Sequence, residues 1–265
     1  MFYDAKEFKV HLPDGNMSCI SFGKGSKPMV MVPGLRISEI DGSAAAVAWF
    51  YRLFAKEYKV YVFDKKDCIH DGYTVHDLAE DLACAMEKLE IKQACVLGVS
   101  LGGMISQDLA INHPYLVSKL VLAVTASRMN QTIHEVVTHW IDIVDTQGLG
   151  AVSKDYMEKG FSEQYLKKYK LLVPLAMKMQ KYLDIERFKR LAEACLTVDS
   201  YKDLDKIQCP VLVLGGGKDK IVTGQASLEM AEKLGCECHM YPELSHEAYN
   251  EAKDFNMRVW EFFQN

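Results

Sequence analysis

Long apolar runs are missing from this sequence, and none approaches the roughly 18 to 20 consecutive apolar residues that a membrane-spanning helix needs. The opening residues, MFYDAKEFKVHLPDG, carry charges where a signal peptide would be apolar. An excess of positive charge is also missing, since 31 Lys and Arg residues stand against 36 Asp and Glu residues, for a net charge of -5. These absences predict a cytoplasmic protein that binds neither a membrane nor nucleic acid.

Cysteine pairs with the spacing of a zinc site are missing as well. Most of the 8 cysteines lie inside apolar segments, which is typical of reduced thiols packed in a core. Cys236 and Cys238 form the one close pair, and no second pair accompanies them. Two histidines and two aspartates within residues 70–77 could supply ligands, but Thr74 and Asp77 have the spacing of a helix capping box. We therefore predict no metal ion and no other cofactor.

Apolar, β-branched runs alternate along the chain with segments of helical periodicity. Such alternation is typical of an α/β fold, in which parallel strands are joined by right-handed crossovers and helices cover both faces of the sheet. An antiparallel hairpin around Pro13-Asp14-Gly15 adds two edge strands, so we predict a mostly parallel sheet of about eight strands. The other expected strands are 28–32, 58–63, 94–99, 119–124, 210–214 and 236–241, and the expected helices are 44–56, 74–89, 103–113 and 223–234.

One long stretch interrupts this alternation. Residues 129–205 have a helical pattern with breakers at Gly148 and Pro174, and no strand is evident among them. Because ligands of open α/β sheets bind at the carboxyl ends of the strands, an insertion that leaves from a strand end would roof the ligand crevice. We expect a core formed by residues 1–128 and 206–265, with residues 129–205 as an inserted helical cap.

The stretch Gly98-Val99-Ser100-Leu101-Gly102 follows one expected strand and precedes an expected helix. In that context a G-x-S-x-G sequence predicts a nucleophile elbow, a sharp turn that presents the serine hydroxyl above the sheet. The alternative is an ordinary turn in which Ser100 caps the following helix. A serine hydroxyl is a weak nucleophile without a base, so the elbow also requires a histidine and a carboxylate at other strand ends.

Both groups occur at such positions. Asp219 follows the strand 210–214, and His246 follows the strand 236–241. The segment Thr125-Ala126-Ser127, which follows the strand 119–124, holds no competing acid. The order Ser100, Asp219, His246 is the order of the catalytic triad in α/β-hydrolases.

Acyl transfer also needs hydrogen-bond donors for the oxyanion. We assign one to the backbone N–H of Leu101, directly after the serine, and the other to the N–H of Leu35, in the loop after the strand 28–32. Arg36 follows Leu35 and is a candidate for binding substrate, as are His139 and Trp140 in the cap. The alternatives are a solvent-facing arginine and ordinary packing of a cap helix.

On these residues, the chain resembles the α/β-hydrolase superfamily over essentially its whole length. The stretch from Gly98 to Thr125, together with Trp140 and Gly148 in the cap, is similar to small capped esterases and to 3-oxoadipate enol-lactonases. The resemblance implies an α/β-hydrolase fold and a cofactor-free enzyme that acts on a small-molecule acyl substrate.

Three places depart from that family pattern. Pro33-Gly34 stands where many relatives have His-Gly, but the donor at Leu35 is a backbone group and is retained. Asp64-Lys65-Lys66 stands where relatives tend to have an Arg-Gly sequence. After Trp140 the chain reads Ile141-Asp142 and lacks the arginine that a dicarboxylate lactone would need, so an enol-lactone substrate is not indicated.

The sequence thus predicts a serine hydrolase that cleaves a small carboxylic ester, lactone or thioester through an acyl-enzyme. The same triad also serves acyl transfer, perhydrolysis and C–C bond hydrolysis, so these activities are alternatives. A ligand-binding receptor with the same fold and little turnover is an alternative from another class. The residue pattern does not indicate an oligomeric state.

Overall fold

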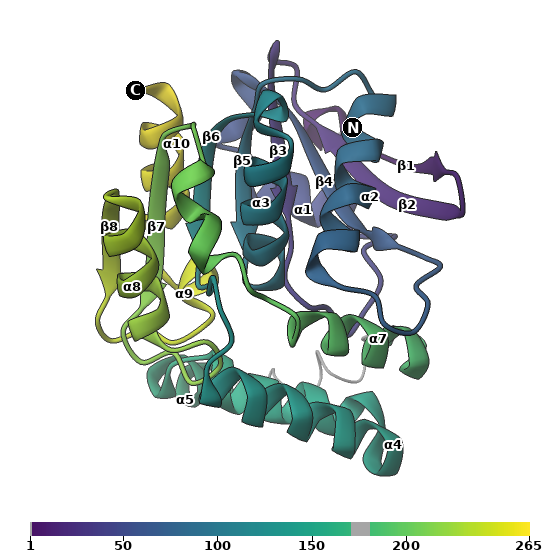
Figure 1. Ribbon diagram of the computed structural model, residues 1–265, viewed down its shortest axis with the longest axis vertical. Helices are drawn as coiled ribbons and strands as arrows, with labels where there is room; N and C mark the ends of the chain where they lie inside the picture. Colours follow the sequence, from purple (N-terminus) through teal and green to yellow (C-terminus); the bar gives the residue numbers. More distant parts are fainter. Residues whose placement is uncertain (1, 171–180) are drawn as a thin grey trace.

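The computed structural model describes residues 2–170 and 181–265. Its centre is an eight-stranded sheet with the order β1-β2-β4-β3-β5-β6-β7-β8 (Figure 1). β2 pairs antiparallel with β1 and with β4, and all other neighbouring strands pair in parallel, which confirms the predicted sheet. The strands are β1 (Lys6–Leu12), β2 (Gly15–Phe22), β3 (Lys27–Val32), β4 (Tyr58–Lys66), β5 (Ala94–Val99), β6 (Val117–Ala123), β7 (Val211–Gly216) and β8 (Glu237–Tyr241).

Helices cover both faces of this sheet (Figure 1). One face carries α2 (Val75–Lys88), α3 (Leu101–Asn112) and α8 (Gly224–Leu234), and the other carries α1 (Ala44–Phe50) and α10 (Phe255–Gln264). Each set of helices buries its own hydrophobic cluster against the strands. The central strand β5 is buried at every position, as expected for a parallel strand that is covered on both faces.

Helix α2 begins with the predicted capping box. Thr74 Oγ1 accepts from the backbone N–H of Asp77 at 3.2 Å, and the N–H of Thr74 donates to Asp77 Oδ2 at 2.9 Å. Within the described ranges, no three His, Cys, Asp or Glu side chains are grouped so that they could hold a metal ion. Those ranges also contain no helix with the length and apolar composition to cross a bilayer.

Strand β4 extends beyond its expected end at Phe63 and includes Asp64, Lys65 and Lys66, all of them buried. The three charged side chains made this segment look like a loop in the sequence, because charged groups are rarely buried without partners. Lys66 has such partners, since its Nζ lies 2.8 Å from the carboxylate of Asp14 and 3.0 Å from that of Asp81.

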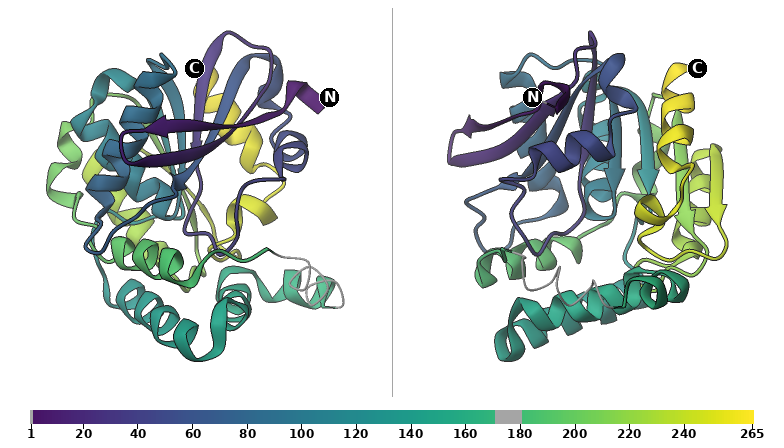
Figure 2. Two further views of the ribbon diagram at one scale, coloured as in Figure 1. Left: turned by 90° about the vertical axis from the view of Figure 1, so that its right-hand side faces the viewer. Right: turned by 180° about the vertical axis from the view of Figure 1, so that it is seen from behind.

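Between β6 and β7 the chain leaves the sheet. It forms α4 (Gln131–Gly160), α5 (Glu163–Tyr169) and α7 (Ile185–Cys195), which lie together at one end of the molecule (Figures 1 and 2). The backbone departs from helical geometry at Gly148, where φ is 73°, as the sequence predicted for this breaker. Pro174, the second expected breaker, lies outside the described residues.

The two ends of this insertion meet at the edge of the core. Arg128 and Asp199 form an antiparallel bridge, and the backbone N–H of Ser200 donates to the carbonyl of Ser127 at 2.8 Å. After this β-bridge, residues 201–206 form a short 3-10 helix that contacts α8. We propose the bridge between Arg128 and Asp199 as the boundary of the cap, so that the cap ends near residue 199 rather than at 205.

Candidate functional site

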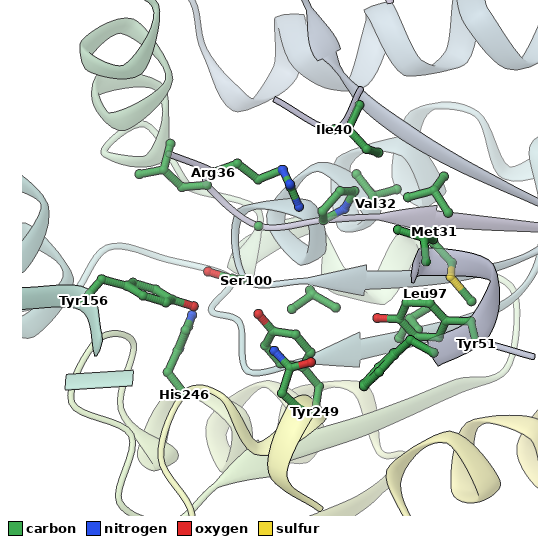
Figure 3. Close-up of a pocket in the computed structure, with 18 of the residues that line it drawn as sticks. Met31, Val32, Arg36, Ile40, Tyr51, Leu97, Ser100, Tyr156, His246 and Tyr249 are labelled. Carbon is green, nitrogen blue, oxygen red and sulfur yellow. The ribbon is translucent and has the colours of Figure 1, made fainter. Parts of the chain in front are cut away.

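A cavity of about 410 Å³ lies where several parallel strands end and the cap begins. Residues of β3, β4 and β5 and the loops that follow strands supply one part of its wall, and α1, α4 and the segment 246–250 supply the rest (Figure 3). This is the place where open α/β sheets bind their ligands. The polar residues that line the cavity are Arg36, Tyr51, Ser100, Tyr156, His246, Tyr249 and Asn250.

Ser100 occupies a strained turn between β5 and α3. Its φ is 54° and its ψ is -122°, a conformation that a residue with a side chain rarely adopts. Its side chain makes no capping hydrogen bond to α3, although Ser100 stands at the N-cap position. The structure therefore excludes the helix-cap interpretation and gives Ser100 the geometry of a nucleophile elbow.

Close packing around the elbow explains its glycines. A Cβ at Gly98 would lie 2.5 Å from Ser106 Oγ, and a Cβ at Gly102 would collide with the carbonyl oxygen of Val32. The turn is also held by two hydrogen bonds, from the N–H of Ser100 to the carbonyl of Ala123 at 2.9 Å and from Thr125 Oγ1 to the carbonyl of Ser100 at 2.7 Å. The strain at Ser100 is thus sustained by its surroundings.

His246 and Asp219 form a buried pair beside the cavity. His246 Nδ1 lies 2.8 Å from Asp219 Oδ2, and the second carboxylate oxygen accepts from the N–H groups of Ile221 at 2.8 Å and Val222 at 3.0 Å. Because Nδ1 is engaged by Asp219, the Nε2 of the imidazole is the nitrogen that remains for chemistry in the cavity.

The two partners shift each other's titration. Burial raises the pKa of Asp219, but the charge of His246 and the hydrogen bonds to the carboxylate outweigh it, and the net pKa is lowered. Burial lowers the pKa of His246, but the charge of Asp219 and their hydrogen bond outweigh it, and the net pKa is raised above 6.5. Asp219 is therefore an anion at neutral pH and stabilises the protonated form of His246.

A glycine allows the loops of Asp219 and His246 to meet. A Cβ at Gly216 would collide with the carbonyl oxygen of Ser245, the residue directly before His246. The N–H of Lys218 also donates to the carbonyl of Leu244 at 2.9 Å. The end of β7 can thus lie directly against the loop after β8, which brings the acid to the histidine.

The loop after β3 approaches the serine from the other side. A Cβ at Gly34 would lie 3.0 Å from Ser100 Cβ and 3.5 Å from Ser100 Oγ, so this loop passes over the hydroxyl. Among the hydrogen bonds between described residues, neither the N–H of Leu35 nor that of Leu101 has a carbonyl acceptor. Both donors expected for the oxyanion hole are therefore available.

The three residues suggested for substrate binding have different positions. Arg36 and Trp140 line the cavity, and the indole Nε1 of Trp140 donates to Asp155 Oδ2 at 2.7 Å. His139 is exposed and is not among the residues that line the cavity, so the structure does not support a substrate contact there. The physical reason is that successive residues of a helix point about 100° apart, so Trp140 and its neighbour face different surroundings.

Glu247 is a feature that the sequence analysis missed. It directly follows His246, is 3% exposed, and its carboxylate accepts hydrogen bonds from Tyr156, Tyr249 and Asn250. Burial raises its pKa, although these donors oppose the effect. Tyr156 comes from α4, so Glu247 connects the cap to the histidine loop. The only signal in the sequence was an acidic residue beside a histidine in a strand-end loop.

Comparisons with known proteins identify the family and the fold of the chain. The family model described as serine aminopeptidase, S33 matches residues 40–253, which is most of the chain. The 3-oxoadipate enol-lactonase 2 of Acinetobacter baylyi is 25% identical over 154 residues, a match that covers 57% of this chain and 56% of that protein. The chain thus spans little more than half the length of this relative.

Two solved structures show the same fold. The enol-lactonase of Burkholderia xenovorans has a TM-score of 0.86 at 20% sequence identity, over 97% of this chain and 100% of that one. An esterase of Exiguobacterium antarcticum has a TM-score of 0.82 at 19% identity, over 98% and 100% of the two chains. At sequence identities this low, the similarity shows a shared fold and does not indicate a shared substrate. From the family match and the fold, the chain is an α/β-hydrolase that belongs to the serine aminopeptidase S33 family.

Proposed function

We propose that this protein is a serine hydrolase that cleaves a small carboxylic ester, lactone or thioester with an apolar acyl part. One observation carries the proposal: the serine of a strained elbow and the histidine of a buried His–Asp pair line the same cavity. The enol-lactonase and the esterase to which the chain is similar fit this reaction class. An arginine suited to a dicarboxylate lactone is still lacking directly after Trp140, so we place the substrate among simpler esters.

The reaction follows from the roles of these groups. His246 takes the proton of Ser100 as the hydroxyl attacks the carbonyl carbon, and Asp219 stabilises the imidazolium that forms. The N–H groups of Leu35 and Leu101 hold the oxyanion. Collapse of the tetrahedral intermediate expels the alcohol, which receives the proton from His246. Water then attacks the acyl-enzyme by the same sequence and releases the acid.

The apolar part of the cavity is where we expect the acyl chain of the substrate to bind. Figure 3 shows Met31, Leu97 and Tyr51 on one side of Ser100, with Tyr156 and His246 on the other. Leu97 and Ser100 are three positions apart at the end of β5, a distance of about 10 Å. An apolar acyl chain of about eight carbons has that length. We therefore place the acyl chain between the sheet and α1, and the leaving group toward the cap.

A larger side chain on α1, in the apolar part of the cavity, is expected to shorten the acyl chain that the protein accepts. Val47 in α1 and Tyr51 at its C-cap both line the cavity and lie one helical turn apart. In Val47→Phe, loss of room for about three methylene groups at about 0.8 kcal/mol each should lower kcat/KM for an octanoate ester about 50-fold. The acetate ester should keep its kcat/KM. The measurement is a series of p-nitrophenyl esters of increasing chain length.

Ala45→Phe is the matched control, because Ala45 is exposed on the same helix and does not line the cavity. It should leave the whole series unchanged. A Val47→Phe variant that keeps the wild-type preference for octanoate would contradict the proposed position of the acyl chain.

The positive charge of Arg36, which lines the cavity, leads us to expect a preference for substrates that carry a carboxylate. Arg36 donates to the carbonyls of Ser38 at 3.1 Å and Glu39 at 3.3 Å, and it forms no ion pair among the described residues. Arg36→Ala should therefore raise KM for a carboxylate-bearing ester about 10- to 100-fold, since a charge-assisted contact contributes about 1.5 to 3 kcal/mol. KM for a neutral ester of the same length is the internal control. An equal change in both KM values would show that Arg36 does not read substrate charge.

The experiment that tests the proposal as a whole needs no knowledge of the substrate. A fluorophosphonate reacts with an activated serine, and peptide mass spectrometry then identifies the modified residue. We expect one equivalent of label, on Ser100. Absence of label on the folded protein would contradict the assignment.

A further inference from the structure

Lys65 is a buried charged residue to which the reaction described above gives no role. It lies at the end of β4 and is 4% exposed. Its Nζ donates to the carbonyl oxygen of Gly34 at 2.7 Å and also to the carbonyl oxygen of Pro33. Both acceptors belong to the loop that passes over Ser100. An ammonium group is thus bound to the backbone of the loop that carries Leu35.

Because the peptide group is planar, the contact between Lys65 and the carbonyl of Gly34 also orients the N–H of Leu35. The carbonyl of Gly34 and the N–H of Leu35 belong to one planar peptide unit, and no cis peptide bond occurs in the described chain. In a trans peptide unit the C=O and N–H bonds point in opposite directions. A cation that holds the oxygen on one side therefore fixes the direction of the N–H on the other side. It also polarises the peptide, which strengthens that N–H as a donor.

On this basis, and resting on the proposed hydrolase function, we propose that Lys65 is a positioning residue of the oxyanion hole. Its ammonium group holds the carbonyls of Pro33 and Gly34 and so directs the N–H of Leu35 toward the carbonyl oxygen that reacts at Ser100. Lys65 does not touch the substrate and acts through the loop alone.

The surroundings of Lys65 are built to keep it in place. The N–H of Lys65 donates to Asp64 Oδ1 at 2.8 Å, and Arg187 of α7 donates through Nη2 to the carbonyl of Lys65 at 2.9 Å. Arg187 Nη2 also lies 4.0 Å from the buried carboxylate of Asp64. A helix of the insertion thus fixes the end of β4, and β4 in turn fixes the oxyanion loop.

The charge of Lys65 is titratable near neutral pH. Burial, helped by the positive charges of Arg36 and Arg187, lowers its pKa to about 8 against the attraction of Asp64. The thiol of Cys195, whose own pKa is raised by burial to about 12, stays neutral. A lowered lysine pKa means that the charge is present below about pH 8 and is lost above it. Any function that needs the charge should weaken as the pH rises through that value.

The test uses the rate at which a fluorophosphonate labels Ser100, because the phosphoryl oxygen of the reagent occupies the oxyanion hole. Lys65→Met keeps the apolar stem and removes the ammonium group. Loss of one oxyanion donor costs about 100- to 1,000-fold, and we expect loss of its orientation to lower the second-order labelling rate at least about 10-fold. Lys66→Met is the matched control, since Lys66 is equally buried but binds Asp14 and Asp81. It should label within about 2-fold of wild type.

The pH profile separates positioning from a merely structural role. In wild type the labelling rate should rise as His246 loses its proton and fall again above about pH 8. Lys65→Met should lack the alkaline fall. Lys65→Arg, whose guanidinium stays charged, should also lack it while labelling faster than Lys65→Met. If Lys65→Met does not fold, the wild-type and Lys65→Arg profiles decide alone.

Three outcomes would overturn this inference. The first is labelling of folded Lys65→Met at the wild-type rate, the second is an alkaline fall that persists in Lys65→Met, and the third is an alkaline fall that persists in Lys65→Arg. In each of these cases Ser100 is still labelled, so the hydrolase function stands and only the role of Lys65 fails. Absence of label on wild-type Ser100 would instead contradict the proposed function and this inference with it.

Discussion

Replacing Ser100 by alanine is expected to lower kcat for ester hydrolysis at least about 1,000-fold while the protein stays folded. The members of a triad act as a unit, so removing the nucleophile leaves only the slow reaction supported by binding and the oxyanion donors. The fold should be preserved because the side chain of Ser100 makes no capping hydrogen bond to α3. The measurement is steady-state turnover of a p-nitrophenyl ester, with the thermal unfolding midpoint determined on the same sample.

A matched control uses another serine of the same segment. Ser106 is buried in α3 and donates to the carbonyl of Gly102 at 2.6 Å. Ser106→Ala should cost stability and leave most of the turnover intact. If purified Ser100→Ala turned over ester at the wild-type rate, the assignment of the nucleophile would be wrong.

Asp219→Asn is expected to have the second largest effect, a loss of kcat of about 1,000- to 10,000-fold. The amide cannot stabilise the imidazolium, and it favours the tautomer of His246 that carries its proton on the wrong nitrogen. The exchange is nearly isosteric, and the N–H groups of Ile221 and Val222 can still donate to the amide oxygen. We therefore expect a folded protein whose kcat is lowered far more than its KM changes.

We also expect Asp219→Asn to change the pH dependence of kcat/KM. The charge of Asp219 raises the pKa of His246, so in wild type kcat/KM should rise with pH through an apparent pKa above 6.5. Without that charge, burial lowers the pKa of His246 more than the charge of Glu247 raises it, so the rising limb of Asp219→Asn should move to lower pH. An unchanged limb would show that another group sets the titration of His246.

Strand ends made the position of the candidate site predictable from sequence. Ser100, Asp219 and His246 are far apart along the chain, yet each follows a short apolar run. In a parallel sheet the carboxyl ends of such runs meet at one edge, so alternation of strands and helices was sufficient to bring the three together. The same logic identified the loop with Leu35, because it too follows a parallel strand.

The alternation of strands and helices did not predict side-chain contacts between elements that are far apart in the sequence. Lys65 and Lys66 looked like loop residues because only their partners across the fold make burial of their charge acceptable. Glu247 gained its role from Tyr156, which reaches it from α4 of the insertion. No helix was assigned to residues 255–264, which pack as α10 against the face of the sheet opposite α3. A periodic pattern shows that a helix has an apolar face and does not show which surface that face covers.

The central claim is catalysis with turnover, and one measurement tests it most directly. Pure protein is mixed with neutral p-nitrophenyl esters from acetate to decanoate, and the alcohol released is followed as equivalents per protein chain. A serine hydrolase should release many equivalents at a constant rate, with the highest kcat/KM for acyl chains near the eight carbons that we propose for the cavity, and the rate should fall at least about 1,000-fold in Ser100→Ala. A ligand-binding receptor would stop after about one equivalent or release none. A stoichiometric burst without a steady-state rate on every ester would contradict the hydrolase function.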